Sequence, residues 1–299
     1  MAPLTVWFAE TRPHFLPCSL VFVQAGVSLA IFEGYAIRVF DLAMTVLGAL
    51  LAQISVNVLD DYYDYTSGID LMAERTSLSG GSGLLASGKL KPLHVYFFGM
   101  LCLAGVVVVG AYFVATIGVE MIPVGVIGIV LVYTYTNRLA KIGLGEFACG
   151  LGFALMSIGA YVVQARTFST SIFLVAMISA FLMFNILLLN EFPDVNADRF
   201  GKRRNIPIAL GLKRSSLIFC TVIVLILVYL ATLVLAKCLP LHALAALGAL
   251  PLASMAAKGA LRHFNNPNRL ANYLQAYFVF TILFPFLMSA GMVAATIRI

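Results

Sequence analysis

The side chains best suited to chemistry gather in two short acidic stretches, residues 57–70 and 190–198, of a chain with only 13 Asp and Glu residues. If the first stretch continues a helix at about 100° per residue, its polar side chains share an arc of about 100°. The members of that arc are Asn57, Asp60, Asp61 and Asp64. Gly68 can then end the helix in a left-handed conformation, which would place Asp70 nearby.

The second stretch repeats this one-sided arrangement. Asn190, Asp194 and Asp198 follow one another at every fourth position, so a helix places them on one stripe. Carboxylates crowded on one face repel each other, and Mg²⁺ relieves this by binding carboxylate oxygens together with phosphate oxygens of a substrate. The alternative is a pair of solvated helix ends. We predict facing stripes that hold Mg²⁺ around a diphosphate, with these metal ligands: Asp60, Asp61, Asp64, Asp70, Asn190, Asp194 and Asp198.

Basic residues near both stretches could bind the diphosphate itself. Arginine grips phosphate oxygens with a planar fork, whereas lysine acts as a point charge. The candidates adjoin the acidic stretches or lie in the loop opposite them, and they are Arg75, Arg138, Lys141, Arg199 and Lys202. The alternative for each is an ordinary basic residue in a cytoplasmic loop of a membrane protein.

The composition shows which elements must position these residues. Hydrophobic residues make up 62% of the 299 residues, charged residues 11%, and the mean hydropathy is +1.00. Soluble domains average roughly 45–50% apolar and about 25% charged residues, so an ordinary soluble domain is excluded. The five scattered cysteines form no metal or disulfide pattern. We predict an all-α polytopic membrane protein, a single domain over residues 1–299, with nine transmembrane helices around a central cavity.

Nine apolar runs come close to the roughly 20 residues that a membrane-spanning helix needs. They are expected at residues 16–33, 39–58, 93–116, 118–136, 143–164, 171–190, 215–236, 241–257 and 273–296. With a cytoplasmic N-terminus, 15 of the 19 Lys and Arg residues fall on the cytoplasmic side. The positive-inside rule therefore predicts a cytoplasmic N-terminus and an extracytoplasmic C-terminus, in the inner membrane if the source is prokaryotic. The basic loops are explained by this topology, and no nucleic-acid partner is expected.

With these motifs the chain resembles the UbiA superfamily of intramembrane prenyltransferases over nearly its whole length. That family has nine transmembrane helices, with Asp-rich motifs after the second and the sixth. The first motif is most similar to the menaquinone-type branch, which prenylates 1,4-dihydroxy-2-naphthoate. The residues that carry the likeness are Asp61-Tyr-Tyr-Asp64 with Gly68-x-Asp70, then Asn190-xxx-Asp194-xxx-Asp198, Arg199 and Gly201-Lys202-Arg203.

The resemblance implies Mg²⁺-dependent transfer of a polyprenyl group from an allylic diphosphate donor to a small aromatic acceptor, in contact with membrane lipid. The catalytic carboxylates would be Asp60, Asp64, Asp194 and Asp198. The acceptor or the carbocation would be contacted by Asn57, Tyr62, Tyr133 and Glu146. Tyrosine rings can stabilise a cation through their faces, although an interfacial aromatic belt is the alternative for them.

The chain departs from the family pattern in two places, the second of which bears on the acceptor. Many relatives carry Asn where this chain has Asp60, and the usual glycines after Tyr133 and Thr134 are Tyr135 and Thr136 here. The acceptor could therefore also be homogentisate, hydroxybenzoate, a chlorin or a glycerol lipid. An ion-coupled transporter is a further alternative, but transporters place charge near the bilayer midplane in broken helices. Here the charges follow the ends of the apolar runs.

Overall fold

The computed structural model describes residues 2–72 and 80–297, and this part of the chain is helical and contains no β-strand. Nine helical segments within it are long and apolar enough to cross a membrane. They are Pro13–Phe32, Val39–Ser67, Pro92–Thr116, Val119–Ile142, Gly145–Ala165, Thr170–Phe200, Leu212–Leu235, Leu241–His263 and Pro267–Ala294. The prediction of an all-α, multi-pass membrane protein is confirmed.

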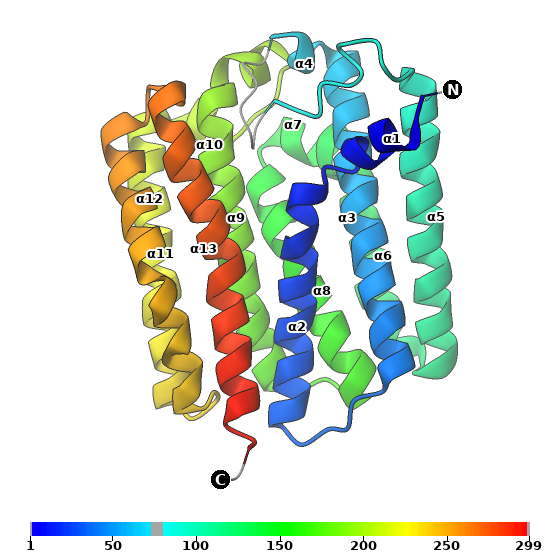
Figure 1. Ribbon diagram of the computed structural model, residues 1–299, viewed down its shortest axis with the longest axis vertical. Helices are drawn as coiled ribbons and strands as arrows, with labels where there is room; N and C mark the ends of the chain where they lie inside the picture. Colours follow the sequence, from blue (N-terminus) through cyan, green and yellow to red (C-terminus); the bar gives the residue numbers. More distant parts are fainter. Residues whose placement is uncertain (1, 73–79, 298–299) are drawn as a thin grey trace.

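The helices stand side by side as one bundle, with the N-terminus at one end and the C-terminus at the other (Figure 1). The longer helices are α2 (Leu16–Phe32), α3 (Val39–Ser67), α5 (Pro92–Thr116), α6 (Ile122–Thr134), α8 (Gly145–Ala165), α9 (Thr170–Phe200), α11 (Leu212–Leu235), α12 (Leu250–His263) and α13 (Pro267–Ala294). The short ones are α1 (Leu4–Glu10), α4 (Ile69–Met72), α7 (Ala140–Ile142) and α10 (Ile206–Leu210). Further short segments are 3₁₀ helices at Pro13–Phe15, Val119–Met121 and Leu241–Ala249 and a π-helix at Tyr135–Leu139.

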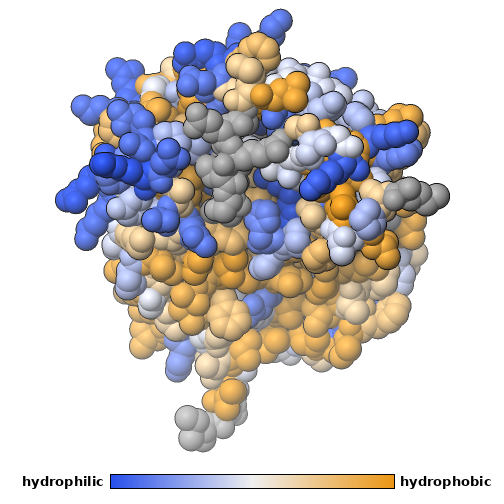
Figure 2. Space-filling model, turned by 45° about the horizontal axis from the view of Figure 1, so that its top comes forward, coloured by the Kyte–Doolittle hydropathy of each residue, from blue (hydrophilic) through white to orange (hydrophobic). Residues whose placement is uncertain are grey.

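Polar and apolar surfaces are separated along the bundle. Hydrophobic residues dominate its side, and hydrophilic residues gather over the end that carries α1, α4 and α10 (Figures 1 and 2). Both acidic stretches lie at this polar end of the bundle, which we call the acidic end. The apolar side suits lipid tails and the polar end suits the interface, so the bundle has the surface of a membrane-spanning protein.

Two helices are longer than the apolar runs that predict them. The run at 39–58 belongs to a helix that continues to Ser67, and the run at 171–190 belongs to one that continues to Phe200. Hydropathy falls where the carboxylates begin, but the backbone hydrogen bonding continues through them. The acidic residues consequently sit on the last turns of two long helices, which fix their directions.

Glycines allow the two acidic stretches to approach each other. Gly68 ends α3 with φ 84°, as its position in the sequence predicts, and turns the chain into α4. At the end of α9, a Cβ on Gly201 would lie 2.1 Å from Cγ1 of Ile69 in α4. Because Gly201 has no side chain, the end of α9 can pack directly against α4, beside the end of α3.

Candidate active site

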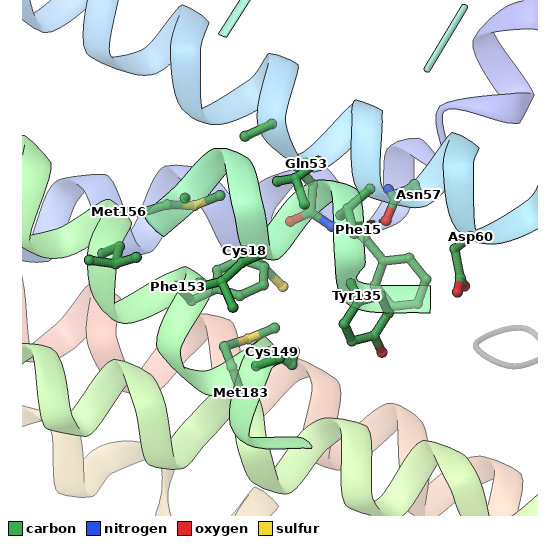
Figure 3. Close-up of a pocket in the computed structure, with 18 of the residues that line it drawn as sticks. Phe15, Cys18, Gln53, Asn57, Asp60, Tyr135, Cys149, Phe153, Met156 and Met183 are labelled. Atoms are coloured by element: carbon green, nitrogen blue, oxygen red, sulfur yellow. Dashed lines mark hydrogen bonds between the residues drawn. The ribbon is translucent and has the colours of Figure 1, made fainter. Parts of the chain in front are cut away.

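A cavity of about 350 Å³ opens between the helices of the bundle, as the sequence predicted. Its polar end is lined by both acidic stretches and by two arginines, and the residues concerned are Arg12, Asn57, Asp60, Asp64, Asp70, Asn190, Glu191, Asp194, Asp198 and Arg203. In Figure 3, Asp60 lies at one end of the labelled side chains and Met156 at the other, with the rings of Tyr135 and Phe153 between them. The cavity thus joins a charged head to an apolar body.

The apolar body reaches far down the bundle. Phe113 and Met121 line it near the end farthest from the carboxylates. Gly125 and Gly128 also line it and place no side chain in the cavity. On α3 the lining extends from Asp64 to Thr45, a distance of about 28 Å at 1.5 Å per residue, compared with a hydrocarbon core of about 30 Å. This shape suits a long hydrocarbon chain with an anionic head at the acidic end.

Arg203 joins the two acidic stretches. One nitrogen, Nη2, lies 3.0 Å from Oδ1 of Asp60 and also contacts Oδ1 of Asp64, both on α3. The other, Nη1, lies 3.5 Å from Oδ1 of Asp198 on α9. Asn205 adds a 2.8 Å hydrogen bond from Nδ2 to the second oxygen of Asp198. The carboxylates of the two helices therefore share one guanidinium.

Arg12 approaches the first stretch from the opposite side. Its Nη1 lies 3.5 Å from Oδ2 of Asp60 and 3.6 Å from Oδ1 of Asp61, and its guanidinium lies 5.0 Å from the ring centre of Phe15. The residue has φ 53°, in the left-handed region, at the turn between α1 and the first span. Thr136 donates a further hydrogen bond to Oδ1 of Asp60, at 2.8 Å.

Both arginines stay cationic in this environment. Burial alone would lower the pKa of Arg203, but the carboxylates of Asp64, Asp60 and Asp198 raise it well above its ordinary range. The pKa of Arg12 is also raised, because the neighbouring carboxylates, led by Asp61, outweigh the effect of burial. The site therefore holds two permanent positive charges among its carboxylates.

In the second acidic stretch, Asn190 and Asp194 have fewer hydrogen-bond and ion-pair partners than the carboxylates of the first stretch. Oδ1 of Asn190 and Oδ1 of Asp194 are buried, line the cavity and have no hydrogen-bond partner. Buried polar oxygens without partners are costly and point to an absent ligand. A hard cation with oxygen ligands, such as Mg²⁺, fits these two atoms. No group of three or more His, Cys, Asp or Glu side chains in the described residues is arranged for a metal, which agrees with the position of Arg203 among the carboxylates.

Asp61 differs from the other carboxylates of the first stretch. It does not line the cavity, and its Oδ2 accepts a 2.8 Å hydrogen bond from the backbone N–H of Ser82. The Ser82 hydroxyl donates to Oε2 of Glu10, also at 2.8 Å. Burial, with the charge of Asp61 as the next cause, raises the pKa of Glu10 to about 8. These bonds hold the glycine-rich segment beside the cavity, which Gly80 and Gly81 line.

None of the predicted diphosphate-binding residues that the structure describes lines the cavity. Arg138, Lys141, Arg199 and Lys202 are exposed. Arg75 lies outside the described residues. The two arginines that reach the carboxylates, Arg12 and Arg203, were not among the predicted site residues. Sequence offered a signal for Arg203, because the segment Gly201-Lys202-Arg203 carries the family resemblance.

Of the residues predicted to contact the acceptor or the carbocation, one lines the cavity and three do not. Asn57 lines the cavity, where its Oδ1 accepts from Gln53 and its Nδ2 donates to the backbone oxygen of Thr11, each at 3.0 Å. Tyr62 packs against the ring of Tyr96, and the side chain of Tyr133 is 39% exposed. Neither of these two tyrosines lines the cavity.

The structure brings further aromatic and acidic side chains to the cavity wall. Tyr135, which in the sequence stands only as a departure from the family pattern, and Glu191, which was not predicted at the site, line the cavity. Oε2 of Glu191 is buried and has no hydrogen-bond partner. Glu146 lies behind this wall, fully buried, and its Oε1 accepts from the backbone N–H of Ile206 at 2.7 Å. The head of the cavity therefore offers both a ring and a carboxyl group, and the carboxyl group of Glu146 interacts with that of Glu191.

This combination of fold and site defines a class: a helical membrane protein with an acidic, arginine-bridged head above an apolar cavity. The model of the UbiA prenyltransferase family matches residues 19–282, and the chain belongs to that family. The prediction of the family from its motifs is confirmed.

Individual relatives support the same assignment. A 1,4-dihydroxy-2-naphthoate octaprenyltransferase of Bacillus subtilis is 28% identical over 68% of this chain and 65% of its own length. A protein of the same name from Haemophilus influenzae is 26% identical over 76% of this chain and 77% of its own. The chain thus spans a little under two thirds of the Bacillus protein.

Solved structures show the same fold. A UbiA homolog from Archaeoglobus fulgidus bound to GPP and Mg²⁺ superposes with a TM-score of 0.64. The alignment covers 95% of this chain and 99% of the other, at 11% sequence identity. At this identity the similarity concerns the arrangement of the helices, and it agrees with the nine spans described above.

Proposed function

We propose that this protein transfers a polyprenyl group from an allylic diphosphate to an aromatic acceptor inside the membrane, with Mg²⁺ as the cofactor and 1,4-dihydroxy-2-naphthoate as the acceptor. The observation that carries the proposal is one continuous cavity with two acidic stripes and two arginines at its polar end and a long apolar body. The acceptor is supported by the names of the bacterial relatives.

The head of the cavity would act on the bond between the donor's C1 and the diphosphate oxygen. That bond breaks with both electrons going to the diphosphate, which leaves an allylic cation. Asn190, Asp194 and Asp198, with Asp60 and Asp64 opposite, would hold Mg²⁺. When bound, Mg²⁺ would neutralise the negative charge that develops on the leaving diphosphate.

Arg12 and Arg203 would supply fixed positive charge to the same leaving group. Both are held in place by carboxylates, so little reorganisation is needed as charge develops. The exposed basic residues Arg138, Lys141, Arg199 and Lys202 would attract the anionic donor before it binds. Arg75 keeps its predicted role in this set.

The apolar body would hold the prenyl tail and exclude water from the allylic cation, which water would otherwise convert to an alcohol. Tyr135 would stabilise the cation through its ring. The free oxygen of Glu191 would accept a hydrogen bond from a hydroxyl of the acceptor. A new carbon–carbon bond to the acceptor ring would then complete the transfer, and the ring would lose a proton or carbon dioxide.

The distribution of Lys and Arg residues between the two sides supports an orientation with the acidic end in the cytoplasm. The two termini lie at opposite ends of the bundle, as an odd number of spans requires (Figure 1). A reporter enzyme fused after Ile299 should therefore be active on the extracytoplasmic side only. A cytoplasmic signal from that fusion would contradict the orientation.

The proposal is tested by incubating purified protein in lipid vesicles with radiolabelled prenyl diphosphate and a panel of acceptors. We expect a prenylated 1,4-dihydroxy-2-naphthoate-derived product, formed with Mg²⁺ and lost after treatment with EDTA. Mass spectrometry of the products would identify a preference for homogentisate, hydroxybenzoate, a chlorin or a glycerol lipid instead. Absence of prenyl transfer to every acceptor, from protein of verified fold, would contradict the proposal.

A further inference from the structure

Arg203 lies where a cation between the two acidic stretches would be expected. Its two terminal nitrogens contact carboxylates of both helices, Asp60 and Asp64 on α3 and Asp198 on α9. The side chain is only 15% exposed, so water does not compete strongly for these contacts. One guanidinium thus neutralises part of the repulsion that the sequence alone attributes to Mg²⁺.

The other half of the site has no such partner. Oδ1 of Asp194 and Oδ1 of Asn190 are buried and receive no hydrogen bond. Arg12, the second arginine of the site, contacts Asp60 and Asp61. The carboxylates on α3 are therefore paired with two arginines, whereas Asn190 and Asp194 on α9 each keep one oxygen without a hydrogen bond.

The local backbone allows the side chain of Arg203 to change partners without moving a helix. Arg203 lies beyond the end of α9, and its backbone N–H donates to the oxygen of Asp198 at 2.9 Å. Lys202 has φ 59°, and the backbone N–H of Arg204 is fixed to the oxygen of Ala140 at 3.0 Å. The segment is anchored on both sides of Arg203, so rotation of its side chain alone can move the guanidinium.

We infer that Arg203 is an internal counter-ion that occupies the place of a divalent cation between the two stripes and passes to the donor's diphosphate when that cation binds. The inference rests on the proposed function, because the diphosphate provides the new partner. A first cation can then bind at Asn190 and Asp194 in the absence of donor. Binding between Asp60, Asp64 and Asp198 requires the guanidinium to leave.

This arrangement couples loading of the metal to arrival of the donor. A diphosphate offers oxygens that match the arginine fork, so the guanidinium loses no charge partner when it leaves the carboxylates. Without the diphosphate, displacement would leave a buried guanidinium unpaired, which is costly. Free metal ions alone should therefore fill the site incompletely.

The test measures binding of Mn²⁺, a paramagnetic substitute for Mg²⁺, to the purified full-length protein without donor. Electron paramagnetic resonance reports free Mn²⁺ directly. Arg203→Gln removes the positive charge, and we expect it to bind Mn²⁺ at least about tenfold more tightly than the wild type, with more ions per chain. Arg203→Lys keeps a charge that cannot bridge several carboxylates, so its affinity should be intermediate.

A matched control lies next in the chain. Arg204 is exposed and its backbone contact does not use the side chain, so Arg204→Gln should bind Mn²⁺ as the wild type does. Thermal unfolding verifies the fold, and Mn²⁺ should raise the melting temperature of Arg203→Gln more than that of the wild type. Methylene diphosphonate should increase Mn²⁺ binding in the wild type and have a smaller effect in Arg203→Gln.

The outcomes separate this inference from the proposed function. If neither Arg203→Gln nor Arg203→Lys binds Mn²⁺ more tightly than the wild type, the counter-ion role is wrong, even if the enzyme transfers prenyl groups. If the wild type already binds its full number of ions without diphosphonate, the coupling is also wrong. Tighter binding in both variants would support the role whether or not the acceptor has been identified correctly.

Discussion

The two acidic stripes use the same kinds of side chain but are in different states. On α3, Asp60 and Asp64 are held by Arg203, and Arg12 also lies beside Asp60. On α9, Oδ1 of Asp194 is buried without a partner. Asp194 on α9 is thus open to a ligand, whereas Asp60 and Asp64 on α3 are already paired with arginine.

This difference shows that a motif rich in carboxylates is not by itself a measure of readiness to bind metal. What matters is how many oxygen atoms the protein has already satisfied. Carboxylates that share a guanidinium are stable without metal, whereas a buried oxygen without a partner gains most from a ligand. The predictions below test this contrast, starting with the largest expected effect.

Removing a carboxylate from either stripe should have the largest effect. We expect Asp64→Ala and Asp194→Ala each to lower turnover at saturating donor by at least about a hundredfold, the scale seen when a key electrostatic group is lost. The two should differ in folding: Asp64→Ala leaves Arg203 with fewer partners and should lower the melting temperature, whereas Asp194→Ala should not. Turnover of Asp194→Ala close to that of the wild type would refute the two-stripe site.

Loss of the second arginine of the site should be less severe. Arg12 contacts Asp60 and Asp61 at 3.5 and 3.6 Å, longer distances than those of a strong charged hydrogen bond. We expect Arg12→Gln to lower turnover about tenfold, consistent with the loss of one of several charged groups. Arg12→Lys is the matched control and should recover part of the rate. Equal rates for the two variants would mean that charge is not the relevant property.

The amide variant of Asp60 should have a still smaller effect. An amide keeps one oxygen, which can accept the hydrogen bond that Thr136 donates to Oδ1 of Asp60. We expect Asp60→Asn to keep measurable activity, within about tenfold of the wild type. A titration of turnover against Mg²⁺ compares it with Asp64→Ala. If both variants are equally inactive, the register proposed for the first stretch is wrong.

The smallest effect concerns stability and lies outside the two stripes. Glu10 is buried beside Ser82, Asp61 and Arg12, and its pKa is raised from 4.5 to about 8. A raised carboxyl pKa means that the folded state favours the protonated form. The contribution of protonated Glu10 to the stability of the fold is therefore fully present below pH 4.5 and is lost as the pH rises through 8.

Glu10→Gln should remove this dependence of folding stability on pH. The amide stays neutral and its oxygen still accepts from the Ser82 hydroxyl. We expect its melting temperature in detergent to exceed that of the wild type increasingly between pH 5 and 8 (roughly the interval between the two pKa values). A constant difference across this interval would show that Glu10 does not titrate there.

Much of the fold is predictable because bilayer thickness fixes the length of the apolar runs. The sequence could not show which arginines enter the site, because the direction of each side chain depends on the conformation of the turn in which it lies. Lys202, with φ 59°, points outward and is exposed, and the next residue, Arg203, is buried among carboxylates. In sequence both are only basic residues that follow an acidic helix.

A similar limit applies to the aromatic residues. Tyr133 was predicted at the site, whereas Tyr135 lines the cavity. A π-helix begins at Tyr135, directly after α6 ends at Thr134, and it changes the rotation per residue. Counting at a constant helical angle places Asn57, Asp60 and Asp64 of α3 correctly at the cavity, although Asp61 does not line it, and the count fails where the helix changes type.

The central claim is that the stripe on α9 accepts a metal ion before the stripe on α3 does. The most direct test is a structure of the protein soaked with Mn²⁺ in the absence of donor, with anomalous diffraction to locate the ions. The account predicts a peak beside Oδ1 of Asp194 and Asn190, with the guanidinium of Arg203 still between Asp64 and Asp198. A peak between Asp60 and Asp64, with no ion at Asp194, would contradict it.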